Sequence, residues 1–570
     1  MSRVRPFYRK KRFLLPLALI LLFGGLVILY VVDTSVSPPM IRDRSPLSWQ
    51  VSEPDSGLFI CEGNWLKQNK YGLWELFVQG SPFERGVANG KLTKELIAFQ
   101  EEAFVNRLRE MIPSDSYLKF LRYFIYWFNR DLDEYLMPEF KEEIYGISFS
   151  ADPRYNFIGS PYQRMLNYHS AHDIGHALQD LMLVGCTSFG VWNSMSADSS
   201  LLIGRNFDFY MGDDFARNPI VCFEKPDTGY PFAMITWGGM TGAVSGMNMA
   251  GITVTINAAK SDIPFSARTP VSLLAREILQ YASSVEDAWS IAGQRETFVS
   301  ESLLIGSGKE NRAAIIEKSP FGLTLIQSRK DYIMCTNHYQ GDLFRDDPHN
   351  SENIKNSASY YRSRRVIRLI TELSPMDAPD AATLLRDQKG INGTTIGMGN
   401  EKAINQLIAH HSVMFKPGEL LMWVSTPPWQ LGPYICYNLS EIFHTFATLQ
   451  TRMDIADSNR LIPMDQFVVS SDFQQFLLFR KQRADIRKLI ETPEMPLPER
   501  SYIEDFTATN PGYFEVWSLA GDLYSSKGAY QDARIMYQKA LSMEIPAWQQ
   551  KEPIIRKLVD CMYNIKTAPE

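Results

Sequence analysis

The 570-residue sequence has few cysteines, and their spacing matches no common structural site. None of the six belongs to a Cys-x-x-Cys pair; they are Cys61, Cys186, Cys222, Cys335, Cys436 and Cys561. This scatter excludes a disulfide scaffold and argues against a structural metal, so no metal is predicted. We expect most of the six to behave as small buried apolar residues.

The sequence also lacks a large excess of charge of either sign, because the formal net charge is only −6. A mildly acidic chain does not indicate a nucleic-acid partner. The glycine-rich segment Gly393–Gly399 lacks both the P-loop lysine and the GxGxxG spacing, and no cofactor is predicted. The length and ordinary composition instead indicate a globular protein with a large core and more than one domain.

One long apolar run is present near the start of the chain. Residues 13–32 carry no charge, and six basic residues precede them in the basic tail at residues 1–12. The run is long enough to span a hydrocarbon core, and the positive-inside rule keeps the tail cytoplasmic. We predict an uncleaved transmembrane anchor, with the rest of the chain on the non-cytoplasmic side (the periplasm in a bacterium). A cleaved signal peptide is the alternative, but no A-x-A site follows.

The rest of the chain divides into regions with different sequence patterns. Residues 33–69, with Pro and Ser concentrated at 35–48, are predicted to form a linker. Residues 70–185 are predicted to contain a strand at 73–78 and helical periodicity from about 100 to 180. Residues 186–445 combine short apolar strands broken by Gly, Asn and Asp with helices at 270–281 and about 359–373, and residues 446–570 are predicted to be helical. This order predicts an α+β fold in which sheets lie between layers of helices.

A single unit similar to a tetratricopeptide repeat (TPR) is predicted at about 514–547. Six positions match the repeat spacing, namely Trp517, Gly521, Tyr524, Ala533, Tyr537 and Ala540. Because such units need neighbours to bury their faces, we favour a helical hairpin packed on the main domain. A docking site for a protein partner is the alternative.

The most informative motif is Gly185–Phe189, which is followed by Gly204–Phe209. In the first, a glycine precedes a cysteine at the edge of an apolar run. If the chain is cut between Gly185 and Cys186, the thiol acquires a free α-amino group beside it. Such an amine titrates near neutral pH and can accept the thiol proton.

Polar residues elsewhere supply the other groups that acyl transfer needs. Arg205 and Asp208 offer a cation that favours thiolate and a carboxylate that holds an ammonium or the arginine. Asn257 and Asn337 stand at the ends of two later predicted strands, where buried amides can stabilise an oxyanion.

Over roughly residues 70–440 the chain resembles the N-terminal nucleophile (Ntn) hydrolases that use cysteine. It is most similar to the acyl-coenzyme A:isopenicillin N acyltransferase group and more distantly to bile salt hydrolases and penicillin V acylases. The segments that carry the resemblance are Gly80–Gly86, Gly185–Phe189, Gly204–Asp208, Gly242–Asn257, Cys335–Tyr339 and Ser412–Pro417.

The resemblance implies a four-layer αββα sandwich and autocatalytic cleavage at Gly185–Cys186 into two fragments that stay associated. It also implies a nucleophile at Cys186 and organising roles for Arg205 and Asp208. The asparagines at positions 257 and 337 would serve the oxyanion hole and a second site position.

The family's late arginine has three candidates in this chain, namely Arg362, Arg364 and Arg365, of which we choose Arg362.

We therefore predict a membrane-anchored, self-processing amidase or N-acyltransferase that acts on a linear amide or a thioester. The expected substrate is an acylated small molecule or a lipid-linked one. Two other classes stay open: an inactive membrane scaffold that uses the TPR-like tail, and a peptidase that pairs the thiol with a histidine. A histidine-rich cluster shares one helix face and consists of His169, His172, Asp173 and His176. We favour a packing role over metal binding for it.

Overall fold

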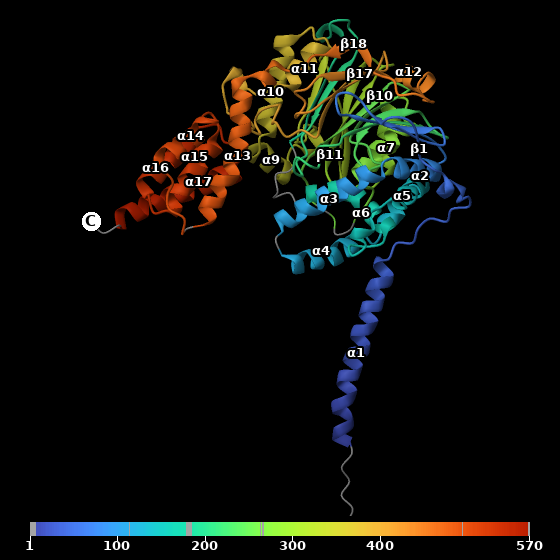
Figure 1. The fold of residues 1–570 in the computed structure, drawn as a ribbon, viewed down its shortest axis with the longest axis horizontal. Helices are drawn as coiled ribbons and strands as arrows, with labels where there is room; N and C mark the ends of the chain where they lie inside the picture. Colours follow the sequence, from blue (N-terminus) through green and yellow to red (C-terminus); the bar gives the residue numbers. More distant parts are fainter. Residues whose placement is uncertain are drawn as a thin grey trace, which may run out of the picture.

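Figure 1 shows the computed structural model of the chain, which describes residues 7–112, 114–177, 185–262, 264, 267–492 and 494–567. Helix α1 (Phe7–Thr34) extends away from the body of the molecule. Residues 1–6 of the predicted basic tail lie outside the described residues. Within the described part of the chain, no helix has both the length and the apolar character needed to cross a membrane, so the predicted anchor at 13–32 is not confirmed.

Two β-sheets form the centre of the fold. The larger has eleven strands, each antiparallel to its neighbours except for the parallel pair β4 and β7. In spatial order its strands are β1 (Ser52–Asp55), β2 (Leu58–Cys61), β3 (Asn64–Gln68), β4 (Trp74–Gly80), β7 (Ile220–Pro226), β8 (Phe232–Thr236), β9 (Ser245–Asn248), β10 (Ile252–Ala258), β11 (Glu301–Ser307), β12 (Arg312–Ser319) and β13 (Gly322–Gln327).

The smaller sheet has seven antiparallel strands. In spatial order they are β14 (Tyr332–Cys335), β5 (Thr187–Val191), β6 (Leu202–Phe207), β15 (His411–Lys416), β16 (Leu421–Ser425), β17 (Tyr434–Asn438) and β18 (Asp457–Ile462). One apolar cluster joins the facing sides of both sheets, with Phe77 and Phe223 from the larger sheet and Ile203 and Phe415 from the smaller one. The two sheets therefore pack face to face.

Helices cover both outer faces. A second cluster packs helices on the larger sheet, among them α2 (Pro82–Leu92), α3 (Lys94–Met111), α5 (Pro138–Ser148), α6 (Pro161–Ala177), α7 (Val271–Tyr281) and α8 (Val285–Gln294). A third packs α10 (Ser359–Leu373) and α11 (Ala378–Leu385) on the smaller sheet. Shorter or peripheral helices are α4 (Asp115–Phe128), α9 (Pro348–Asn356) and α12 (Leu439–His444). The predicted α+β class is confirmed.

The motif Gly80–Gly86 forms the start of α2 and fastens it to its neighbours. Ser81 and Glu84 form a capping box there. A Cβ on Gly86 would lie 2.1 Å from the backbone oxygen of Glu143, so only glycine allows α2 and α5 to approach so closely. Arg85, which follows Glu84 in the helix, pairs with the buried carboxylates of Glu143 and Glu224.

The predicted linker at 33–69 is wrong in its second half, because β1, β2 and β3 belong to the larger sheet. The hairpin between β2 and β3 turns at Glu62 and Gly63, which both have positive φ (47° and 78°). Such a two-residue turn usually has Asn or Asp in its first position, and glutamate there hides the signal.

The region after residue 445 begins with a further strand, since β18 pairs with β17 at the edge of the smaller sheet. The helices that follow have a core of their own: α13 (Ser471–Glu491), α14 (Arg500–Ala508), α15 (Phe514–Ser526), α16 (Tyr530–Leu541) and α17 (Trp548–Thr567). The TPR-like unit corresponds to the hairpin of α15 and α16. In Figure 1 this C-terminal helical region lies to one side of the two sheets.

Candidate active site

Cys186 lies immediately before β5, which pairs between β14 and β6 in the smaller sheet. Its side chain is only 1% exposed, and this burial raises the pKa of the thiol to about 11, against the opposing effect of Arg205. In the intact chain the thiol is therefore protonated at neutral pH. A buried, protonated thiol is a weak nucleophile until something changes its surroundings.

Arg205 is the hydrogen-bond donor to this thiol. It lies on β6 opposite Ser188 of β5, and its Nη2 is 3.7 Å from Cys186 Sγ. The guanidinium also reaches the larger sheet, where it donates to the backbone oxygens of Val244 (3.1 Å) and Ile256 (2.5 Å). Burial lowers the pKa of Arg205, while the nearby Cys186 and Asp208 oppose that shift. The arginine thus places a positive charge beside the sulfur from between the two sheets.

Asp208 follows directly after β6, and its backbone contacts Gly185, the residue before the cysteine. Its carbonyl oxygen accepts the Gly185 N–H at 2.9 Å. Its carboxyl is fully buried, and the loss of solvent raises its pKa to about 7, although Arg362 and Arg205 act in the opposite direction. A carboxyl with such a pKa can hold or release a proton near neutral pH.

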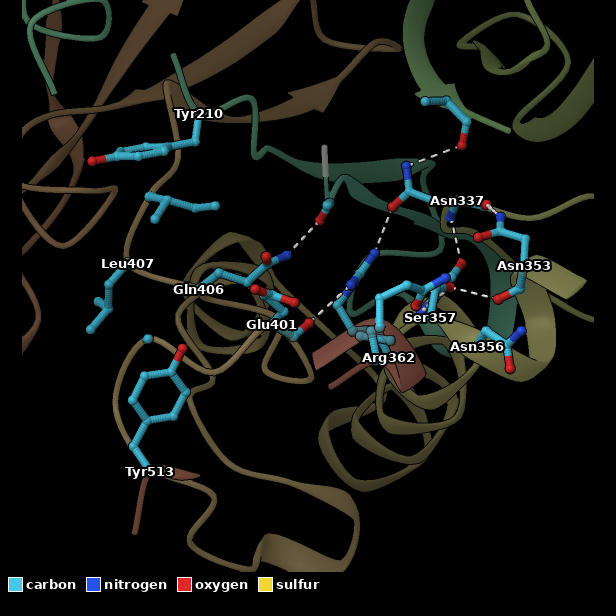
Figure 2. Close-up of a pocket in the computed structure, with 18 of the residues that line it drawn as sticks. Tyr210, Asn337, Asn353, Asn356, Ser357, Arg362, Glu401, Gln406, Leu407 and Tyr513 are labelled. Atoms are coloured by element: carbon cyan, nitrogen blue, oxygen red, sulfur yellow. Dashed lines mark hydrogen bonds between the residues drawn. The ribbon is translucent and has the colours of Figure 1, made fainter. Parts of the chain in front are cut away.

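Arg362 and Asn337 form a second polar pair near the first. Arg362 donates from Nη2 to Asn337 Oδ1 (2.5 Å) and from Nη1 to the backbone oxygen of Glu401 (2.9 Å). Asn337 is fixed in turn, because its Nδ2 donates to the Ala258 oxygen (3.1 Å). Figure 2 shows Arg362 lying between Asn337 and Glu401.

The structure separates the three candidate arginines. Arg362 is buried and is close enough to Asp208 for their opposite charges to attract. Arg364 is exposed, and Arg365 forms an ion pair with Asp387. Of the three, the chosen Arg362 is the one beside the other site residues.

Asn257, on β10, is held across the interface of the two sheets. Its Oδ1 accepts from Ser188 Oγ (2.7 Å), and its Nδ2 donates to the Cys335 oxygen (3.1 Å). In the intact chain both ends of the amide therefore have protein partners. To stabilise an oxyanion, the Nδ2 group must either leave the Cys335 carbonyl or donate to the oxyanion as well as to that carbonyl.

A cavity of about 600 Å³ reaches this cluster, and its lining includes Gly185, Asn337, Arg362, Glu401 and Gln406. Figure 2 shows several of these side chains together. The C-terminal helical region supplies the facing wall with Phe476, Phe479, Arg480, Arg483, Tyr513 and Gln549. Since Gly185 lines the cavity and Cys186 is buried, the residue before the cysteine separates the thiol from the open space.

Direct contacts hold the C-terminal wall in place. Arg480 of α13 pairs with Asp213. Gln550 of α17 donates to Glu401 Oε1 (3.0 Å), and the backbone oxygen of Glu544 accepts from Asn400 (2.9 Å). The TPR-like unit is thus part of a region packed on the main domain.

In the residues that the structure describes, no histidine hydrogen bonds to Cys186 Sγ, which disfavours a Cys-His pair. His411 Nε2 instead lies 2.9 Å from Ser245 Oγ, a partner of Arg205, and burial lowers the pKa of the adjacent His410 to about 3. His411 is thus linked to Arg205 through Ser245.

The histidine cluster upstream of the cut has structural contacts where it is described. His169 Nε2 accepts the Thr241 N–H (2.9 Å), and Asp173 accepts the Val271 N–H (2.8 Å). The side chains of His172 and His176 lie outside the described residues. Among the described residues no group of three or more His, Cys, Asp or Glu is arranged to hold a metal ion.

Sequence reasoning missed Gln406 and Glu401. Both lie in the loop between α11 and β15 and belong to no motif, so no sequence signal distinguishes them. They enter the site only because that loop folds back onto Gly185 and Arg362.

The α+β sandwich thus holds a buried cysteine, arginine and aspartate around the Gly185–Cys186 bond. Residues 194–424 match the family described as acyl-coenzyme A:6-aminopenicillanic acid acyl-transferase. This match, together with the relatives that follow, supports an Ntn hydrolase group of amidohydrolases and acyltransferases.

Curated relatives share part of the chain. An uncharacterized protein of Archaeoglobus fulgidus is 24% identical over 47% of this chain and 50% of its own length. The N-acylethanolamine-hydrolyzing acid amidase of Caenorhabditis elegans is 22% identical over 38% of this chain and 59% of its own length. The chain thus spans only about half to three-fifths of these relatives.

A solved structure of the Caenorhabditis elegans N-acylethanolamine-hydrolyzing acid amidase ortholog is also similar. It shares 17% identity, with a TM-score of 0.30, and the match covers 41% of this chain and 93% of that one.

Proposed function

We propose that this protein is a self-processing Ntn amidohydrolase or N-acyltransferase whose nucleophile is Cys186. The observation that carries the proposal is the contact of Cys186 Sγ with Arg205, directly behind Gly185 at the wall of the cavity. Cleavage before Cys186 gives the thiol an α-amino group as proton acceptor, with an ordinary pKa of about 8. It also frees the chain at Gly185, so that this residue can move away from the thiol.

The fragments stay together after cleavage because they share a sheet. Strand β4 precedes the cut and pairs in parallel with β7, which follows it, from Trp74 opposite Ile220 to Gly80 opposite Pro226. The ion pairs of Arg85 with Glu224 and of Arg276 with Glu143 also cross between the two fragments. Separating them would expose a buried sheet edge and leave buried charges without partners.

In the proposed reaction, Cys186 attacks a linear amide or a thioester and forms an S-acyl enzyme. Asn257 and Asn337 stabilise the oxyanion, Arg205 and Asp208 organise the thiol and amine, and water or an amine releases the acyl group. Asn337 is set for this role by Arg362.

The substrate we propose is an acylated small molecule or a lipid-linked amide. Its support is the wall of Phe476, Phe479 and Tyr513 facing polar groups at Arg362 and Gln406, a combination that accepts an apolar chain ending in a polar carbonyl group. The name of the Caenorhabditis elegans relative, which hydrolyses N-acylethanolamines, supports an acyl amide.

We further propose that residues 13–32 tether the enzyme to a membrane, with its catalytic domain on the non-cytoplasmic side. The support is the charge-free run and the basic residues before it. Membrane fractionation of the full chain and of a chain lacking residues 1–32 tests this: the full chain should require detergent, and an equal need for detergent in both contradicts the tether.

Intact-mass analysis of the wild type and of Cys186→Ala tests the main proposal. The wild type should yield two fragments, residues 1–185 and 186–570, while Cys186→Ala should stay whole. The processed protein should release the aminocoumarin from a long-chain N-acyl aminocoumarin. A wild type that stays whole contradicts self-processing, and a processed protein inert towards acyl amides and thioesters favours the scaffold alternative.

A further inference from the structure

Gln406 makes a direct hydrogen bond to the bond that is proposed to be cut. Its Nε2 lies 2.7 Å from the backbone oxygen of Gly185, and its side chain is buried, with only 1% of its surface exposed. It belongs to the loop that leads into β15 and lines the same cavity as Gly185. Figure 2 shows this contact as a dashed line from Gln406.

The orientation of the Gln406 amide is fixed by its partners. The same Nε2 also lies 3.3 Å from Asp208 Oδ2. Both neighbours are oxygens, so the NH₂ end of the amide must face them, and each can take one of its two hydrogens. The side chain therefore presents a preoriented donor to the Gly185 carbonyl.

Gly185 is held on both sides by this arrangement. Its N–H donates to the Asp208 carbonyl (2.9 Å) while its own carbonyl accepts from Gln406. A Cβ at position 185 would lie 2.4 Å from Gln406 Nε2, so the amide approaches as closely as only a glycine permits. The contact thus requires the residue type found at the cleavage position.

We infer that Gln406 is the side-chain oxyanion donor for self-cleavage at Gly185–Cys186. This inference rests on the proposed function, because it concerns the maturation step of that site. A neutral donor already aimed at the carbonyl oxygen in a buried site stabilises the negative charge that develops there, at little reorganisation cost.

The step balances without any added reagent other than water. Cys186 Sγ attacks the carbonyl carbon of Gly185, a C–S bond forms, and the oxygen becomes an oxyanion held by Gln406. Collapse breaks the C–N bond, and the thiol proton ends on the departing nitrogen of Cys186, which becomes the α-amino group. Water then hydrolyses the thioester to a Gly185 carboxylate and the free thiol.

Gln406→Met and Gln406→Glu test the inference, with cleavage followed over time by intact mass in the full chain. Gln406→Met removes the donor at nearly the same length, and cleavage should slow by about 10²–10³-fold, the usual cost of losing one oxyanion donor. Gln475→Met is the matched control, since Gln475 is an exposed glutamine of α13 that is not among the residues lining the cavity. It should cleave at the wild-type rate.

Gln406→Glu supplies a readout that a merely structural role would not change. A protonated carboxyl donates to the Gly185 oxygen, whereas a carboxylate cannot. Its cleavage rate relative to the wild type should therefore fall as the pH rises, and this holds even if Gln406→Met folds poorly.

The outcomes separate the two proposals. A wild type that cleaves, together with a Gln406→Glu whose relative rate is independent of pH or a Gln406→Met as fast as the control, overturns the role of Gln406 alone. A wild type that never cleaves overturns self-processing and this inference with it.

Discussion

Arg362 donates to Asn337 Oδ1 at 2.5 Å and so joins α10 to the segment that follows β14. The bond orients the asparagine amide with its Nδ2 towards the end of β10, where it meets the Ala258 oxygen. The same guanidinium lies near Asp208 and opposes the rise in that carboxyl's pKa. One side chain therefore sets both the geometry of Asn337 and the charge balance beside the thiol.

Replacing Arg362 should impair the acyl-transfer reaction. We expect Arg362→Met to lower kcat/KM of the processed enzyme on an N-acyl aminocoumarin by on the order of 100-fold, because Asn337 loses its orienting donor. Arg364→Met, on the exposed face of the same helix, is the control and should leave kcat/KM unchanged. Equal effects of the two changes would contradict a role for Arg362 in the site.

The buried Asp208 should make the stability of the intact chain depend on pH. Its pKa is raised from 3.8 to about 7, so between these values the folded state holds more protons than the unfolded state. The contribution of Asp208 to the free energy of unfolding is then fully present below about pH 4 and lost as the pH rises to about 7. A shift of this size corresponds to about 4 kcal/mol.

Urea unfolding of Cys186→Ala and of Cys186→Ala/Asp208→Asn measures this effect in a chain that cannot cleave itself. The first protein should lose stability relative to the second between pH 4 and pH 7. Parallel pH profiles would show that Asp208 titrates in the folded protein as it does in the unfolded one.

The C-terminal wall should affect substrate binding. Phe476 and Phe473 lie on the same face of α13 and in the same core, but Phe476 lines the cavity and Phe473 does not. We expect Phe476→Leu to change KM and the preferred acyl-chain length while Phe473→Leu alters only the melting temperature. Acyl aminocoumarins of increasing chain length provide the measurement, and identical chain-length profiles would place the acyl group elsewhere.

The two fragments should behave as one particle after cleavage. Because β4 and β7 pair along seven residue positions in the core sheet, residues 1–185 and 186–570 should co-elute on gel filtration in nondenaturing buffer. They should separate only in denaturant. Separate elution of the smaller fragment without denaturant would contradict a shared sheet in the processed protein.

Much of the central fold could be predicted from local pattern. The apolar runs at 220–223, 252–256 and 302–305 are strands because β-branched and aromatic residues there are bounded by Gly, Asn and Asp. The hairpin of β2 and β3 was not predicted, since its Glu62-Gly63 turn lacks the usual residue types.

Some of the site residues could also be predicted from the sequence, whereas others needed the structure. Cys186, Arg205 and Asp208 stand close together in the sequence within recognisable motifs, so their neighbourhood follows from two adjacent strands. Choosing Arg362 over Arg364 and Arg365 needed the helix to be placed. Only the tertiary structure shows that Arg362 contacts Asn337, whereas Arg364 is exposed and the buried Arg365 pairs with Asp387. Their catalytic roles stay predictions that the experiments above address.

The sequence by itself determined the chemical candidates: a glycine-cysteine bond, an arginine and aspartate on the next strand, and an α+β core. Only the tertiary structure decided that Gln406 binds the Gly185 carbonyl and that the C-terminal helices wall the cavity. The physical reason is the range of the interactions. Strand and helix patterns depend on neighbours a few residues apart, whereas these contacts join segments far apart in the chain, which only the packing of the whole core brings together.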